Sequence, residues 1–186
     1  MKRPNEMRER ILTSVEELIA TRGVNNFSLR DICDYLYIST GSLYYHFKTK
    51  DDIIMAIINK HFTELENDYI EWLKKHKENN DLTKERFIDI VLYKGTELFN
   101  RSKIHIYLIN ECMRENNKLK EKYIDLIDSW YQKILLGVKQ VYGNHENSDA
   151  IAYMILLIIE GLTIRVVLDD RKPELENKMK ELLKGL

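Results

Sequence analysis

Two short helix signals, separated by a brief joint, lie between residues 28 and 47. Ser28 and Asp31 have the spacing of a capping box, which satisfies the backbone N–H groups left open at a helix start. Ser39 is a typical N-cap residue for the second helix. The apolar residues of the first helix recur at helical spacing: Leu29, Ile32, Cys33 and Leu36. A helix pair of this size is the unit that proteins insert into the major groove of DNA.

The second helix of the pair has an outer face unlike that of an ordinary surface helix. Leu43 and Phe47 lie one turn apart and face the first helix. At about 100° per residue, the opposite face carries hydroxyl groups and aromatic rings and no acidic residue. This face consists of Gly41, Ser42 and Tyr45, flanked by Thr40 and Tyr44. It suits contact with another molecule, although the tyrosines could instead be half-buried packing residues of another helical hairpin.

The segments on either side support the first interpretation. An amphipathic stripe precedes the pair and ends at the C-terminal cap signal Arg22-Gly23. The stripe consists of Met7, Ile11, Leu12, Val15, Leu18 and Ile19. After the pair, Thr49 can cap a fourth helix, and Lys48 and Lys50 flank the second helix of the pair where phosphate oxygens would lie. Together these signals predict a three-helix DNA-binding head.

The region from Arg8 to about Phe62 resembles the DNA-binding region of the TetR family of bacterial transcriptional regulators. The resembling stretches are Arg-Glu-Arg-Ile-Leu at 8–12, Arg22-Gly23, Ser28 to Ile32, and Gly-Ser-Leu-Tyr-Tyr-His-Phe-Lys-Thr-Lys at 41–50. The resemblance implies that Ser28 and Lys50 each hold a phosphate. It also implies that the second helix of the pair is the recognition helix, which reads DNA. The residues at its start, which would contact bases and phosphates, are Ser39, Thr40, Gly41 and Ser42. The residues farther along, which would contact bases or the DNA backbone, are Tyr44, Tyr45 and His46.

One residue departs from the family pattern. Tyr37 occupies the joint between the two helices, where the family usually has glycine. A non-glycine residue at a left-handed turn position costs about 1 kcal/mol, so we expect a reshaped turn and an altered angle of the recognition helix. Tyr37 is also the one feature that favours a rival function, namely a helical ligand-binding or interaction protein whose head does not bind DNA specifically.

Beyond residue 50 the sequence predicts helices broken by short polar joints. The whole chain contains two prolines and seven glycines, and no alternating strand pattern persists. We expect an all-α fold of about nine helices: a head of residues 1–50 and a helical effector-binding and dimerisation body of residues 51–186. A long fourth helix ending near residues 78–80 joins the two. Further helices are expected at about 83–101, 103–115, 117–142, 148–169 and 173–184.

The last two predicted helices indicate a dimer. The helix from Ser148 to Asp169 is apolar nearly all round and therefore needs two partners. Pro173 opens the final helix at a permitted position. We expect the pair to pack against its copy as a four-helix bundle, to which the family resemblance also points. A monomer that buries this helix in its own core is the alternative. The expected interface residues are Ile151, Ile155, Ile158, Leu162, Leu175, Met179 and Leu182.

The middle helices are expected to enclose a pocket for an effector. The family resemblance implies a small apolar or amphipathic molecule. Aromatic residues and methionines at helical spacing are also common in ordinary cores, so each candidate has that alternative. Glu160 is polar within the most apolar helix, and it could meet a ligand or pair across the dimer. The candidates are Tyr93, Phe99, Tyr107, Met113, Trp130, Tyr131, Tyr153, Met154 and Glu160.

Charge is compatible with these expectations. The net charge is −1, yet residues 1–50 hold eight Lys or Arg against six Asp or Glu, and the remainder holds 21 against 24. A weakly positive head suits specific binding of double-stranded DNA through a small footprint. Two heads on a palindromic operator would need half-sites about 34–36 Å apart or a multiple of that distance.

Other function classes have little support. The five histidines are scattered, with no His-Glu-x-x-His and no nucleophile motif, so we expect no enzyme, cofactor or metal. Cys33 and Cys112 belong to no Cys-x-x-Cys pattern, which fits a reducing cytosol, and no secretory signal is seen; we expect a cytoplasmic protein. The apolar stretch Ala150 to Leu168 contains Glu160 and Arg165, which favours a buried helix over a membrane span.

Overall fold

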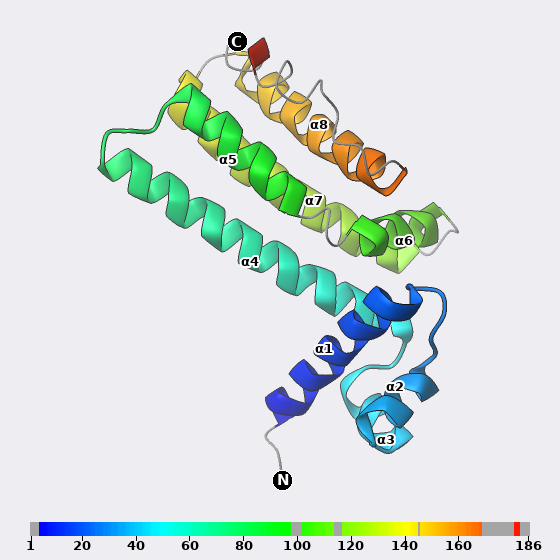
Figure 1. Ribbon diagram of the computed structural model, residues 1–186. Coiled ribbons are helices and arrows are strands. Elements are labelled where there is room, and N and C mark those ends of the chain that lie inside the picture. Colours follow the sequence, from blue (N-terminus) through cyan, green and yellow to red (C-terminus); the bar gives the residue numbers. More distant parts are fainter. Residues whose placement is uncertain (1–3, 98–101, 114–116, 145, 169–180, 183–186) are drawn as a thin grey trace. The chain divides into compact units, whose positions relative to one another are not determined.

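The computed structural model describes residues 4–97, 102–113, 117–144, 146–168 and 181–182 (Figure 1). The described residues form eight α-helices and no strand, which confirms the all-α fold class. The helix expected at 173–184 lies almost wholly outside them. The helices are α1 (Pro4–Arg22), α2 (Leu29–Leu36), α3 (Thr40–His46), α4 (Lys50–Glu78), α5 (Lys84–Glu97), α6 (Ser102–Met113), α7 (Asn117–Tyr142) and α8 (Ser148–Leu168).

The described residues fall into two compact units. Unit 1 comprises those of Met1–His61 and Lys103–Leu119, and unit 2 those of Phe62–Ser102 and Lys120–Leu186. Unit 1 therefore holds α1, α2, α3, the first turns of α4 and nearly all of α6. The expected division after residue 50 assigned α6 to the body, whereas in the structure it groups with the head.

The core of unit 1 is built on the apolar stripe of α1. Ile11, Leu12 and Val15 are fully buried. α2 packs against α1, and α3 packs against α2. Leu43 and Phe47 of the α3 region are buried in this core, as their spacing predicts. Each of these two short helices buries one side in the core, so its opposite side is exposed to solvent.

The fourth helix begins and ends where the sequence predicts. Thr49 caps it, since its hydroxyl accepts a hydrogen bond from the Asp52 N–H at 3.1 Å and the Asp52 carboxylate accepts one from the Thr49 N–H at 3.1 Å. The ammonium of Lys60 on α4 pairs with the carboxylate of Glu9 on α1 at 2.9 Å. α4 ends at Glu78. Local capping thus begins α4, and side-chain pairs of Lys60 with Glu9 and of His61 with Glu16 join it to α1.

α6 joins unit 1 through a hydrogen bond to the start of α4. The Tyr107 hydroxyl donates to the Asp51 carboxylate at 3.0 Å. The Lys50 ammonium lies 6.0 Å from the centre of the Tyr107 ring. These contacts join α6, which the sequence assigned to the body, to the first turn of α4.

The core of unit 2 contains one unusually close approach between helices. Gly137 lies in the middle of α7, where glycine costs about 1 kcal/mol relative to alanine. A Cβ atom at this position would lie 2.1 Å from the Tyr69 hydroxyl oxygen and 2.4 Å from Cε2 of Phe87. Only glycine therefore allows the rings of α4 and α5 to approach α7 so closely.

α8 has one buried face and one exposed face, which corrects the predicted dimer interface. α8 packs against α5. Three of the predicted interface residues, Ile151, Ile155 and Leu162, are buried within the chain itself, and Ile158 is half-buried. Leu182 is exposed, and Leu175 and Met179 lie outside the described residues. Among the α8 side chains that the structure describes, the exposed apolar ones are Tyr153, Met154, Leu157 and Ile164.

None of the described helices combines the length and the apolar content needed to span a bilayer. Within the same part of the chain, no group of three or more His, Cys, Asp or Glu residues is placed to hold a metal ion. Cys33 is buried, as predicted from its position on the core face of α2, and burial raises the pKa of its thiol. This thiol is therefore a packing group.

Candidate nucleic-acid interface

The start of α2 is fixed by the predicted capping box. The Asp31 N–H donates to the Ser28 hydroxyl oxygen at 3.3 Å, and the Ser28 N–H donates to the Asp31 carboxylate at 2.7 Å. The Ser28 hydroxyl also donates to this carboxylate. These bonds from Ser28, with a smaller contribution from Arg22, hold the pKa of Asp31 below its usual value. The hydroxyl that the family resemblance assigns to a phosphate is thus already engaged within the head.

Tyr37 adopts the left-handed backbone conformation itself, with φ 54° and ψ 45°. Its N–H is directed at the carbonyl oxygens of Asp34 and Cys33, and the Ile38 N–H donates to Cys33 at 3.0 Å. The side chain is 96% exposed, so no packing compensates for the strain of about 1 kcal/mol. The joint keeps the geometry that glycine would give, and the expected reshaping of the turn is not seen.

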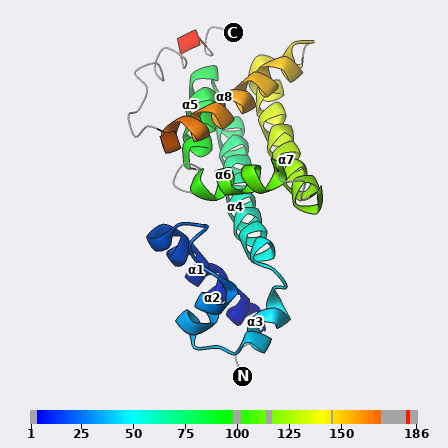
Figure 2. The same ribbon diagram turned by 90° about the vertical axis from the view of Figure 1, so that its right-hand side faces the viewer.

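The recognition helix α3 presents the face that the sequence predicts. Ser39 caps it by accepting a hydrogen bond from the Ser42 N–H at 3.1 Å. Tyr45 is 73% exposed and Tyr44 is 46% exposed. α2 and α3 lie next to each other in both views of the molecule (Figures 1 and 2). Because α2 covers only the inner side of α3, the phenol rings remain on the surface.

The outer face of α3 has no internal reason for a glycine. Gly41 is exposed, and a Cβ atom there would meet only the Ser39 hydroxyl oxygen, at 3.9 Å. Thr40 beside it is also exposed. Farther along the helix, the Tyr45 ring meets the half-buried His46 ring edge-on, with centroids 5.0 Å apart. The face therefore offers hydroxyl groups, aromatic edges and one position without a side chain.

The two lysines that flank α3 behave differently. Lys48 is exposed, and its ammonium donates to the Tyr44 carbonyl oxygen at 2.6 Å, at the C-terminal end of α3. The Lys50 ammonium donates instead to the carbonyl oxygens of Val24 and Phe27 and lies 4.0 Å from the centre of the Phe27 ring. Burial lowers the pKa of Lys50. The Lys50 ammonium is thus turned inward, onto loop carbonyls, and its implied phosphate contact stays a prediction.

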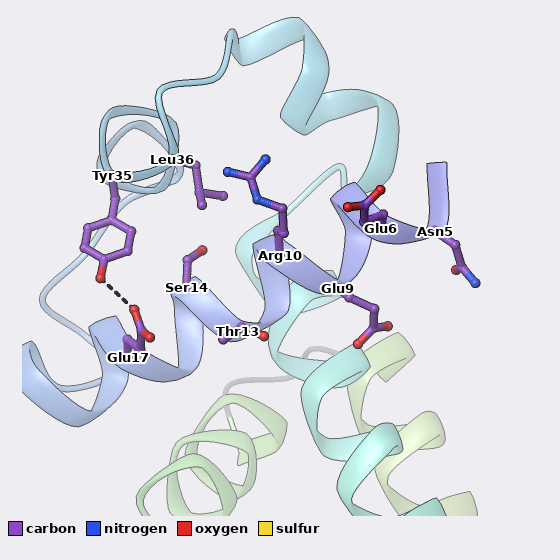
Figure 3. A pocket seen from close by; sticks show the side chains of 9 residues that line it. All are labelled: Asn5, Glu6, Glu9, Arg10, Thr13, Ser14, Glu17, Tyr35 and Leu36. Carbon is purple, nitrogen blue, oxygen red and sulfur yellow. Dashed lines mark hydrogen bonds between the residues drawn. The ribbon is translucent and has the colours of Figure 1, made fainter. Parts of the chain in front are cut away.

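A surface hollow of about 600 Å³ lies elsewhere in the head, between α1 and the end of α2 (Figure 3). The Tyr35 hydroxyl donates to the Glu17 carboxylate at 2.6 Å at one end of this hollow. Its charged lining consists of Glu6, Glu9, Arg10 and Glu17. Because carboxylates repel phosphate, we do not include this hollow in the interface.

The predicted effector residues that the structure describes differ widely in their exposure. Tyr93, Met113, Tyr153 and Met154 are exposed, and Phe99 lies outside the described residues. The hydroxyls of Tyr107 and Tyr131 donate to Asp51 and Asp149, respectively. Glu160 is half-buried, and burial raises the pKa of its carboxyl. Periodicity identified apolar helix faces, but it could not tell which of them face the interior.

Among the candidates that the structure describes, Trp130 is the one buried in the core of unit 2. Its ring meets that of Tyr69 edge-on, with centroids 5.4 Å apart. Tyr69 was not singled out in the sequence analysis. Gly137 was the missed signal, since a glycine in the middle of a long helix marks a close approach by another group.

Comparison with known proteins supports the assignment of the head. Residues 11–57 match the family model for bacterial regulatory proteins of the tetR family. The HTH-type transcriptional repressor BepR of Brucella suis is 40% identical over 55 residues, covering 30% of this chain and 26% of BepR. The HTH-type transcriptional regulator QacR of Staphylococcus aureus is 30% identical over 127 residues, covering 64% of this chain and 65% of QacR. The matches therefore span less than two thirds of these curated relatives.

Solved structures match over nearly the whole chain. A protein from Saccharomonospora viridis, assigned as a transcriptional regulator and crystallised in complex with choline, has a TM-score of 0.72 and 25% identity. The match covers 97% of this chain and 95% of that one. The fatty acid degradation regulator FadR of Bacillus halodurans has a TM-score of 0.72 at 16% identity, with 96% and 94% covered. The second likeness shows a shared fold.

Proposed function

The chain belongs to the TetR family of bacterial transcriptional regulators, and we propose that it binds a palindromic DNA operator as a homodimer and releases it when a small effector binds. The observation that carries the proposal is the exposed polar and aromatic face of α3. Tyr44 and Tyr45 lie on the surface, whereas Leu43 and Phe47 of the same segment are buried. A free face of this kind, on the second helix of a helix-turn-helix, is where such units read bases.

The proposed DNA contacts divide into two kinds. Tyr44, Tyr45 and His46 offer rings and donors to base edges, while Thr40 and Ser42 offer hydroxyls near the start of α3. Lys48 stands at the end of the helix and can reach a phosphate, since its ammonium is exposed. Contacts to phosphates position the head, and contacts to bases specify the sequence.

Tyr45→Ala should weaken binding to the selected operator by about 1–3 kcal/mol, or about 5–150-fold, if its ring reads a base. Random-site selection with the purified protein would supply the operator, and gel-shift titration would measure the affinity. Tyr35→Ala is the matched control. Tyr35 is an exposed tyrosine of the same head (49%), but it is bonded to Glu17 rather than carried on α3.

We expect the control to bind the operator as tightly as the wild type does. If Tyr45→Ala and Tyr44→Ala both kept the full preference for the operator over a shuffled duplex, the outer face of α3 would not be the reading surface. If random-site selection yielded no enriched sequence, the rival function, a helical ligand-binding protein without specific DNA binding, would be favoured instead.

Gly41→Ala should have opposite effects on stability and on DNA binding. Nothing inside the chain opposes a Cβ atom at this position. Alanine should therefore raise the free energy of unfolding by about 0.5–1 kcal/mol, through helix propensity. The added methyl group would obstruct a closely approaching DNA backbone, so operator affinity should fall. Urea unfolding and gel-shift titration would measure the two effects, and a variant that gains stability with unchanged affinity would contradict the proposed close approach.

The proposed dimer uses the exposed face of α8. Apolar side chains of α8 that the fold leaves on the surface need a partner, and a single head makes too small a footprint for specific binding. Gly161 lies on the same helix, and a Cβ atom there would meet nothing within 4 Å, so a second helix could approach closely. Among the residues that the structure describes, the exposed apolar ones of this face are Tyr153, Met154, Leu157 and Ile164, and the exposed Arg165 lies one turn after Gly161.

The proposed release is a two-state switch. An effector shifts the balance between a DNA-binding and a released state only if it binds the two states with different affinities. The hydrogen bond between Tyr107 of α6 and Asp51 of α4 offers a contact through which α6 can act on the head. The choline found in the similar structure from Saccharomonospora viridis supports a small molecule as the effector. Here we propose an apolar or amphipathic one.

A further inference from the structure

Two hydrogen-bond donors are buried without a partner in the core of unit 2. The side chains of Tyr69 on α4 and Trp130 on α7 are 0% and 1% exposed. Neither the Tyr69 hydroxyl nor the Trp130 Nε1–H has a hydrogen-bond partner within the part of the chain that the structure describes. Buried polar groups in proteins are nearly always hydrogen-bonded, so two such donors in one place need an explanation.

The two donors belong to side chains that touch. The rings meet edge-on, with centroids 5.4 Å apart and an angle of 66° between their planes. The Tyr69 hydroxyl lies against the backbone of Gly137, which is two turns beyond Trp130 on the same face of α7. The Tyr69 side chain thus lies along this face of α7, with its ring against Trp130 and its hydroxyl at Gly137.

Packing alone does not require either donor. A phenylalanine at position 69 would fill almost the same volume and leave no unpaired hydroxyl group. Burial raises the pKa of Tyr69, so the phenol keeps its proton at any ordinary pH. The indole N–H of Trp130 can only donate. Each of the two side chains thus offers one hydrogen bond to an acceptor.

The charges nearby favour an uncharged acceptor. Glu66 lies one turn before Tyr69 on α4, and its carboxylate accepts a hydrogen bond from Ser129, the residue before Trp130, at 2.7 Å. Lys133 lies 4.0 Å from the same carboxylate. The charges of Glu66 and Lys133 already balance each other, so no positive charge is left over for an anionic ligand, which Glu66 would repel. On the side of α5, the neighbouring group is the apolar ring of Phe87.

We propose that Tyr69 and Trp130 form the binding site for a neutral, largely apolar molecule that carries a carbonyl or ether oxygen. The inference rests on the proposed function, because it takes this site to be where the effector binds. The Tyr69 ring meets that of Trp130, and the Tyr69 hydroxyl and the Phe87 ring both lie against Gly137, so the ligand must part these side chains. A hydrogen bond that the ligand oxygen accepts from one of these otherwise unpaired donors offsets part of the cost of that opening.

The first test needs no ligand. Tyr69→Phe removes an unpaired hydroxyl and keeps the ring, so the midpoint of thermal unfolding should rise by about 2–4 °C. The matched control is Tyr107→Phe, which removes a hydroxyl that donates to Asp51, and its midpoint should fall. A lower midpoint for Tyr69→Phe would show that the hydroxyl is satisfied by a permanent structural contact, and this would overturn the proposal.

The second test uses three probes of one shape: 2-acetylnaphthalene, 2-ethylnaphthalene and 2-naphthoate. The chain has two tryptophans, so Trp72→Phe leaves Trp130 as the reporter of indole fluorescence. In this background the ketone should bind at least about tenfold more tightly than the hydrocarbon and the carboxylate, because only the ketone is a neutral acceptor. Adding Tyr69→Phe should cut the preference for the ketone over the hydrocarbon to about threefold or less.

Several results would overturn the site: no binding of the ketone up to its solubility limit, equal binding of ketone and hydrocarbon, tightest binding of the carboxylate, or an unchanged preference in Tyr69→Phe. All of these are measured without DNA. The proposed function is tested separately, by operator binding of the wild type without any probe. A protein that binds the ketone but no operator would contradict the proposed function and leave the site standing.

Discussion

Leu157→Arg on the exposed face of α8 should lower operator affinity by about a thousandfold or more. Specific protein–DNA complexes exceed non-specific binding by at least about this factor, and a single head loses half of the palindrome. Leu157 is 48% exposed in the chain and would be buried between two copies of α8. An arginine at this position would place two like charges across the two-fold axis, without partners and out of water.

The control for this prediction is Ile124→Arg. Ile124 is 45% exposed, so its size and exposure match those of Leu157, but it lies near the start of α7 rather than on α8. Sedimentation velocity should give a monomer for Leu157→Arg and a dimer for the control. Operator affinity from gel-shift titration should fall only in the first variant. A dimeric Leu157→Arg protein with wild-type affinity would exclude this face as the interface.

Acid should destabilise the protein through His105 on α6. The side chain is 6% exposed, and burial lowers the pKa of His105 from 6.5 to about 4. Between these two values the unfolded chain binds a proton that the folded chain does not. The stability contribution is therefore complete above pH 6.5 and is lost as the pH falls toward 4. At 1.36 kcal/mol per pH unit, the loss amounts to about 3 kcal/mol.

Urea unfolding at several pH values between 7.5 and 4.5 would measure this loss. His105→Leu removes the titrating group and should flatten the curve over this range, whereas His76→Gln should leave the acid sensitivity in place. His76 is the appropriate comparison because it is only half-buried, stacked on Trp72 with ring centroids 4.1 Å apart. Parallel curves for the wild type and His105→Leu would show that other groups cause the acid loss.

The head shows how far local rules extend. The caps at Ser28, Ser39 and Thr49 each involve partners within three residues, so the sequence predicted them and the structure confirmed them. The contacts that Lys50 makes inside the chain could not be predicted in this way. Its ammonium binds the carbonyl oxygens of Val24 and Phe27, which are 26 and 23 residues away in the chain. No spacing rule describes such a contact, because it depends on how α4 meets the loop between α1 and α2.

The sequence by itself determined the fold class, most helix boundaries and the face of α3 that stays in solvent. These depend on caps, on helical periodicity and on polar residues that need water. It could not decide which side of α8 faces the core, since that helix is apolar nearly all round. Only packing against α5 separates the buried Ile155 from the exposed Leu157. The contact of Tyr69 with Trp130 likewise needed the tertiary structure, because the two residues come from different helices.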